Sequence, residues 1–196
     1  MAKRIFIFNG HPAENSISRT LCEEYAQSAK SAGHEVRFAH LKDLNFDSDF
    51  GFGGYKETKP LEPDLERFLE NLQWAEHIVI ATPMWWGGLP AKLKGLIDRT
   101  FLPGRTFDTR NKTTMGFPSP MLDGRTARLI VTSDTPGWLM SFCYGNALFR
   151  QIRHQIMGFV GIKPTRFTHF NSASHPESGQ VDSWIKSVNQ LGMQAA

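Results

Sequence analysis

Short apolar runs alternate with amphipathic patterns along the whole chain, and this alternation restricts the possible folds more than any other feature of the sequence. The apolar runs predict strands at residues 4–9, 34–41, 77–81, 126–132 and 165–170. Strands separated by helices pair in parallel and are covered by helices on both faces of the sheet. The alternation therefore predicts an α/β fold, and the length of 196 residues suits one domain, 1–196.

The segments between these strands carry single apolar stripes at helical spacing. The stripes consist of Ile17, Leu21, Tyr25 and Ala29; of Leu65, Phe68, Leu69 and Leu72; of Leu148, Phe149, Ile152, Ile156 and Met157; and of Val181, Trp184, Ile185, Val188 and Leu191. A further helix is predicted to open at Pro90, and the helix that contains Leu148 is predicted to end near Gly161.

Five parallel strands with this spacing suit a three-layer α/β/α sandwich of flavodoxin-like order 2-1-3-4-5 better than a six-stranded dinucleotide-binding fold. In that order, ligands bind where the first and third strands separate, outside the carboxyl ends of the strands. The loops after the first, third and fourth strands are therefore expected to meet and to carry the chemistry.

Two segments show neither the helical nor the strand periodicity of apolar residues. Residues 43–59 are rich in Asp, Gly and Phe, and we expect a surface loop whose Phe46, Phe50 and Phe52 need cover. That cover comes from the same domain, from a dimer partner or from an active-site rim. Residues 101–124 are rich in Pro, Gly, Thr and Asn, and we expect a long excursion at the rim of the site.

The loop after the third predicted strand holds two tryptophans and two glycines, Trp85 to Gly88. Flat rings suit the wall of a flat ligand, and glycine lets backbone N–H groups approach one closely. The alternative is that both tryptophan side chains are core packing beneath a loop. This loop alone does not separate the two interpretations.

The loop after the first strand leads into a helix through Asn15, Ser16 and Ser18. Free backbone N–H groups, hydroxyl groups and the positive end of the helix dipole favour an anion there, most simply a phosphate, to which His11 can also donate. Neither the dinucleotide fingerprint nor the P-loop motif is present. The plainer alternatives are that Ser16 is only a helix cap and that His11 is a surface residue.

The loop after the fourth strand, residues 133–138, offers Asp134 and Thr135 to the polar edge of a heterocycle. Trp138 and Tyr144 follow it and can shape a substrate pocket, and the Tyr144 hydroxyl can donate a proton. The alternatives are a plain polar turn and two core aromatic rings.

Charge and targeting signals limit the partners. The formal net charge of +3 comes from scattered residues rather than from a stripe, which favours small anionic ligands over nucleic acid. Two cysteines without C-x-x-C spacing indicate neither a disulfide framework nor a zinc site, so we expect no metal. No signal peptide and no membrane-spanning run are evident, and we expect a cytoplasmic protein without membrane insertion.

Together the three loops offer a site for phosphate, a wall for a flat ring and donors for its polar edge, which are the parts of a flavin mononucleotide. The sequence also resembles the flavodoxin-like NAD(P)H:quinone oxidoreductase family along its whole length. The resemblance rests on Asn9-Gly10-His11-Pro12 through Asn15-Ser16, on residues 83–95 with Asp98-Arg99, and on residues 158–162. The turn Asp134-Thr135-Pro136-x-Trp138 looks like a bacterial branch of that family.

The resemblance implies a role for each loop. The flavin phosphate or pyrophosphate is expected at His11, Asn15, Ser16, Ile17 and Ser18. The isoalloxazine is expected along the backbone of Pro83, Met84, Trp85, Trp86 and Gly87, whose amides point to its N1, O2 and N5 region, with support from Thr132, Asp134 and Thr135 on the other side. Family members are homodimers with two sites at the interface, which would also cover the Phe-rich loop.

The implied activity is a ping-pong reaction in which NAD(P)H gives a hydride to flavin N5 and a quinone or similar acceptor then takes it from the same slot. Animal enzymes of the family carry a Gly-rich turn after the fourth strand and a Tyr and a His beyond it. This chain departs there, and Tyr144 is the candidate that we name for the hydride path. A non-catalytic flavin electron carrier and a redox-sensing regulatory subunit are the alternatives. FMN is preferred to FAD because the chain is short, and NADH and NADPH are not distinguished.

Overall fold

The computed structural model describes residues 1–49 and 59–196. Within these ranges no helix combines the length and the apolarity that crossing a membrane requires. The elements in chain order are β1 (Arg4–Asn9), α1 (Ile17–Ser31), β2 (Glu35–His40), η1 (Leu41–Asp43), α2 (Pro63–Trp74), β3 (His77–Pro83), α3 (Ala91–Thr100), β4 (Phe107–Lys112), β5 (Pro118–Pro120), β6 (Thr126–Thr132), α4 (Gly137–Phe142), α5 (Ala147–Arg150), η2 (Gln151–Met157), β7 (Thr165–Phe170) and α6 (Gln180–Gln194).

The central sheet has five strands in the order β2-β1-β3-β6-β7, and every neighbouring pair is parallel. Since β6 and β7 are the fourth and fifth strands of this sheet, the predicted order 2-1-3-4-5 is confirmed. The register pairs Asn9 with Ala81 and Pro83 with Thr132. The carboxyl ends of β1, β3 and β6 therefore lie level with one another, and the loops that follow them start at one edge.

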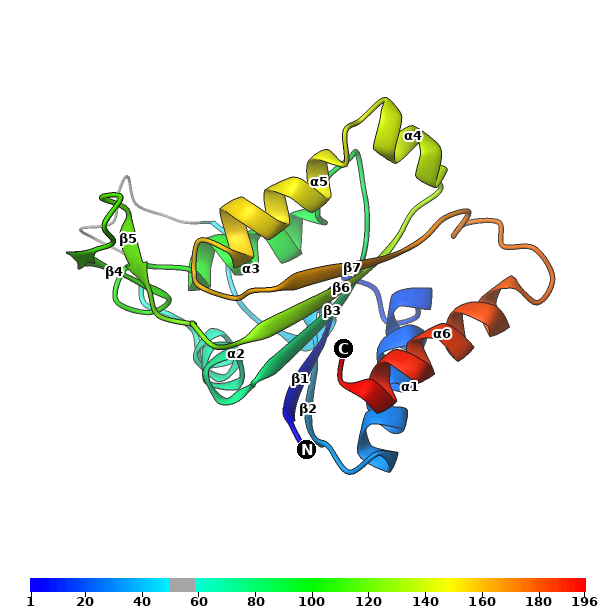
Figure 1. Ribbon diagram of the computed structural model, residues 1–196, viewed down its shortest axis with the longest axis horizontal. Coiled ribbons are helices and arrows are strands. Elements are labelled where there is room, and N and C mark those ends of the chain that lie inside the picture. Colours follow the sequence, from blue (N-terminus) through cyan, green and yellow to red (C-terminus); the bar gives the residue numbers. More distant parts are fainter. Residues whose placement is uncertain (50–58) are drawn as a thin grey trace.

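Helices cover both faces of the sheet (Figure 1), with α1 and α6 on one side and α2, α3 and α5 on the other. The side chains of β1 show why both faces need cover: Ile5 and Ile7 join the core under α1 and α6, and Phe6 and Phe8 join the opposite core. All four are fully buried. A continuous apolar run such as Ile5 to Phe8 is typical of a parallel sheet covered on both sides.

The prediction that residues 101–124 lie at the rim of the site is wrong. Helix α3 leads the chain back from the carboxyl edge to the amino edge of the sheet, and the segment emerges there (Figure 1). It forms a small antiparallel sheet of β4 and β5. Its end is held near the start of β6, where the Leu122 N–H donates to the Val160 carbonyl at 2.9 Å.

The predicted helix over residues 148–161 needs correction. The α-helical part is only α5, which continues as the π-helical segment η2, and a short additional helix, α4, precedes it. Phe46 in the predicted surface loop packs against the core of its own domain, under the Lys92 ammonium. Phe50 and Phe52 lie outside the described residues.

Candidate active site

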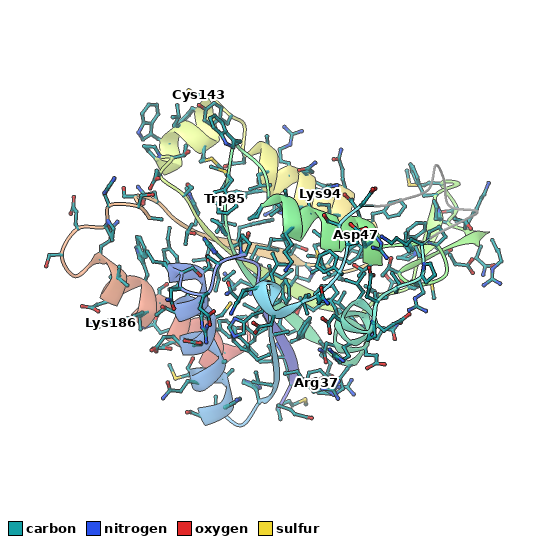
Figure 2. All side chains as sticks on the ribbon, turned by 180° about the vertical axis from the view of Figure 1, so that it is seen from behind. Arg37, Asp47, Trp85, Lys94, Cys143 and Lys186 are labelled. Atoms are coloured by element: carbon teal, nitrogen blue, oxygen red, sulfur yellow. The ribbon has the colours of Figure 1, made fainter. Side chains whose placement is uncertain are left out.

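The first, second and third loops, after β1, β3 and β6, meet at the carboxyl edge of the sheet. The Gly10 N–H donates to the Ala81 carbonyl, and the Met84 N–H donates to the Thr132 carbonyl, both at 2.8 Å. The ring of His11 meets that of Trp85 edge-on, with the centroids 5.5 Å apart. Figure 2 shows Trp85 on the side of the molecule that carries Cys143, away from Arg37. The three loops predicted to meet are therefore in contact.

The second loop is a tight hairpin turn. Trp85 and Gly88 exchange backbone hydrogen bonds of 3.0 and 2.9 Å. Trp86 and Gly87 between them have φ of 53° and 74°, the pattern of a type I′ turn. Because this turn points away from the core, Trp85 is 45% exposed and Trp86 is fully exposed. The alternative interpretation of both tryptophans as core packing is wrong.

A cavity of about 590 Å³ lies between the second and third loops and helices α4 and α5. Its wall consists of Met84, Trp86, Gly87, Ser133, Asp134, Thr135, Met140, Tyr144, Ala147 and Leu148. Six of these residues are among the predicted site residues, and Tyr144 is one of them. Trp138, which we expected to shape a substrate pocket, is 63% exposed and is not part of this wall.

The first loop is arranged to present hydrogen-bond donors. Ser16 caps α1, since its Oγ accepts from the Arg19 N–H at 3.1 Å, and Asn15 before it is exposed. The Ala13 N–H donates to His11 Nδ1 at 3.0 Å, which leaves the proton of a neutral imidazole on Nε2. Burial lowers the pKa of His11 below its usual 6.5, so the ring is neutral at pH 7. His11 thus offers one N–H donor.

The start of α1 fits an anionic group of a cofactor. Ser18 is 1% exposed, and its Oγ has no hydrogen-bond partner within the described chain. The N–H groups of Ile17 and Ser18 likewise have no acceptor among residues 1–49 and 59–196. An unpaired buried hydroxyl costs free energy unless a ligand satisfies it. Amides and a hydroxyl at a helix N-terminus are the donor set that binds a phosphate.

The third loop is tied to the loop after β7. The Asp134 carboxylate accepts from the Ser174 N–H at 2.8 Å and from the Ser174 hydroxyl at 2.7 Å, and these bonds lower the pKa of Asp134. Its two oxygens therefore hold a neighbouring loop, and the residue also lines the cavity. Thr132 is buried, and its carbonyl is the one that holds Met84.

Ser133 lies within the predicted third loop but was not itself named as a site residue, although it lines the cavity. Its Oγ lies 2.7 Å from Nε2 of His169 on β7. The two residues are far apart in the sequence, and only the pairing of β6 with β7 brings them together. No spacing rule within either segment indicates this contact.

The comparisons with known proteins agree with this fold. A family model described as a flavodoxin-like fold, Flavodoxin_2, matches residues 3–190. The chain belongs to this family. The flavodoxin-like chain is 25% identical over 196 aligned positions to an FMN-dependent NADH:quinone oxidoreductase of Polaromonas naphthalenivorans, with 92% of this chain and 88% of the relative covered.

Two other known proteins are similar to this chain, one over a shorter stretch and one at lower sequence identity. The flavodoxin-like chain is 33% identical over 98 residues to an iron-sulfur flavoprotein of Archaeoglobus fulgidus, and the match spans 50% of this chain and only 48% of that relative. The solved structure of an NAD(P)H:quinone oxidoreductase from Methanothermobacter marburgensis superposes with a TM-score of 0.77, covering 100% of both chains at 19% identity. At that identity the superposition supports the fold alone.

Proposed function

We propose that this flavodoxin-like protein is a flavin-dependent NAD(P)H oxidoreductase that transfers a hydride from NAD(P)H to a quinone or similar small acceptor. The observation that carries the proposal is the convergence of two unlike surfaces at one edge of the sheet. One is the donor-rich start of α1, and the other is the cavity between the second and third loops. A flavin nucleotide needs both surfaces, one for its phosphate and one for its ring.

Each loop has a separate task in this proposal. The unpaired Ser18 hydroxyl, the Ile17 and Ser18 amides and the neutral His11 ring would hold the phosphate. The turn of Trp86 and Gly87 and the residues Ser133 to Thr135 would flank the ring. The flavin, when bound, supplies the hydride chemistry, and the protein supplies position and electrostatics. Tyr144 in the cavity wall is the proposed proton donor near the acceptor.

FMN is the preferred flavin, because the similar Polaromonas protein is named as FMN-dependent and its chain is covered almost throughout. We also propose a homodimer. Trp86, Trp138 and Phe142 are exposed around the cavity, and a second subunit would cover these rings. The free thiols of Cys22 and Cys143 support a reducing compartment, and we propose the cytoplasm.

The test is anaerobic oxidation of NADH and of NADPH by menadione, with the purified protein loaded with FMN. We expect turnover on the order of 1–100 per second with one of the two nicotinamide cofactors, typical of flavoenzymes of ordinary efficiency. A rate no faster than that of free FMN at the same concentration contradicts the proposal. If FMN binds tightly in that case, the electron-carrier alternative takes its place.

A further inference from the structure

Ser133 lies in the wall of the cavity and is hydrogen-bonded to His169 of β7, which lies behind it. Ser133 follows β6 directly and is 6% exposed, and its Oγ lies 2.7 Å from His169 Nε2. The Thr135 N–H donates to the same Oγ at 3.2 Å. The only other contact of the hydroxyl within the described chain is a long one, 3.4 Å to the Thr135 carbonyl. Ser133 therefore connects His169 to the cavity, and its hydroxyl retains hydrogen-bonding capacity.

The hydrogen-bonding capacity of a hydroxyl group gives this pair two possible arrangements, which differ in the direction of the Ser133 O–H. A serine oxygen has two lone pairs and one proton, and the Thr135 N–H occupies one lone pair. If His169 Nε2 is unprotonated, it accepts the Ser133 proton, and the second lone pair of Ser133 is left for a ligand. If Nε2 carries a proton, it occupies that second lone pair, and the Ser133 proton can donate to a ligand in place of the long contact to the Thr135 carbonyl.

No charged group of the described residues around His169 fixes its protonation state, so a bound ligand can determine it. Burial alone lowers its pKa below 6.5, so the imidazole is neutral at pH 7 when nothing negative lies nearby. The ring packs edge-on against Phe149 of α5. The charged groups of the neighbouring elements, Asp134 after β6, Arg150 on α5 and Arg153 on η2, do not shift it. A negative charge that enters the cavity would therefore be the dominant influence on the imidazole.

We propose that His169 is a positioning residue that directs the Ser133 hydroxyl, so that Ser133 accepts a hydrogen bond from the oxidised ligand and donates one when negative charge enters the cavity. The inference rests on the proposed function. A hydride carries two electrons and one negative charge into the site. His169 takes up one proton from the bulk solvent on Nε2, Nε2–H donates to Ser133, and the Ser133 O–H turns to the ligand. Charge and protons then balance.

Three variants separate this role from a structural one. Ser133→Ala removes the hydroxyl. His169→Gln keeps a group that can both donate to and accept from Ser133 but cannot take up a proton. His154→Gln makes the same change at an exposed position on η2 and is the matched control. Circular dichroism and flavin absorbance establish that each variant is folded and loaded with FMN.

The readout is the midpoint potential of protein-bound FMN between about pH 5 and 8, the range in which histidine titrates. Uptake of one extra proton per two electrons adds about 30 mV per pH unit to the slope, since a tenfold change in equilibrium constant corresponds to about 30 mV. We expect this extra slope in the wild type and in His154→Gln, and its loss in His169→Gln and Ser133→Ala. Ser133→Ala should also bind FMN about 3- to 10-fold more weakly, as expected for one lost neutral hydrogen bond.

Proton magnetic resonance of His169 gives an independent check, because its pKa should rise when the bound flavin is reduced. Equal slopes in the wild type and in His169→Gln, or a His169 pKa that does not change on reduction, overturn the inference and leave the proposed function intact. If the wild-type protein does not bind FMN, the proposed function and this inference fail together.

Discussion

The Ser18 hydroxyl is the most informative single group at the start of α1. It is buried and lacks a partner within the described chain, although a hydroxyl in such a place is destabilising. A polar side chain that lowers stability without an internal partner is expected where a ligand supplies that partner. Ser18 therefore links stability and cofactor binding in one position.

Ser18→Ala should change these two properties in opposite directions. We expect FMN to bind on the order of 10-fold more weakly, because a hydrogen bond to a charged phosphate is lost. The free energy of unfolding without FMN should stay the same or rise, because an unsatisfied buried group is removed. Flavin fluorescence titration and urea unfolding measure the two effects.

Ser31→Ala is the matched control on the same helix. The Ser31 hydroxyl is exposed and donates to the Gln27 carbonyl at 2.9 Å, far from the helix N-terminus. FMN affinity should be unchanged in this variant. Equal FMN affinity in Ser18→Ala and the wild type would refute the phosphate site at the start of α1.

At the residue scale, the sequence predicted which loops lie at the site better than it predicted which side chains contact one another. The helix start at Ser16 could be predicted because helix starts have fixed local chemistry, and the binding of a phosphate by His11 and Ser16 to Ser18 stays a prediction. The contact between Ser133 and His169 could not, because it depends on the register of two strands. The engagement of Asp134 by Ser174 is likewise a contact between two loops that follow different strands.

At the element scale, the Arg99 side chain on α3 forms hydrogen bonds to the segment that precedes α2. Its side chain is 1% exposed, and Nη2 donates to the Glu62 carboxylate and to the Pro60 carbonyl, both at 2.9 Å. Nη1 donates to the Asp47 carbonyl. A buried guanidinium with these partners holds Asp47 and Pro60 in place beside α3.

Arg99→Ala should lower the free energy of unfolding by about 3 kcal/mol, because Glu62 loses its partner and several hydrogen bonds disappear. Lys94→Ala on the same helix removes the exposed pair with Asp98 and should cost only about 0.3–0.5 kcal/mol. Urea unfolding of both variants measures the difference. Similar losses in the two variants would show that the Arg99 contacts do not stabilise the fold.

Element prediction succeeded where a period exists. Strands β6 and β7 have the predicted bounds, because their apolar patterns end at clear turn signals. Strands β4 and β5 were missed because their segment lacks such a pattern, and strand β4 is exposed beyond its first residues. The π-helical segment η2 shares its apolar stripe with an ordinary helix, so residue spacing does not reveal it.

At the scale of the whole molecule, His77 links stability to pH. Burial, with the charges of Lys3 and Arg128, lowers its pKa from 6.5 to about 3. The unfolded chain therefore binds a proton that the folded chain does not, and the free energy of unfolding should fall by about 1.4 kcal/mol per pH unit as pH drops below 6.5 toward 3.

His77→Gln should remove this dependence and move the midpoint of acid unfolding to lower pH, as followed by circular dichroism. The exposed His175 provides the control, since His175→Gln should unfold like the wild type. Superimposable acid-unfolding curves of His77→Gln and the wild type would contradict the assignment.

The order of the sheet was predictable because alternating strands and helices leave few arrangements for five parallel strands. That order alone located the edge where the loops meet. A helix between two parallel strands returns the chain to the amino edge, so the predicted helix at Pro90 already implied that residues 101–124 begin there; the expectation of a rim at the carboxyl edge overlooked this.

The central claim is that the three loops at this edge bind a flavin and bring it to a nicotinamide cofactor. Anaerobic mixing of the FMN-loaded protein with NADH or NADPH, followed by the visible flavin absorbance, tests it most directly. We predict complete bleaching far faster than with free FMN, and full return of the absorbance when menadione is added. Bound flavin that stays oxidised with both cofactors would contradict the account.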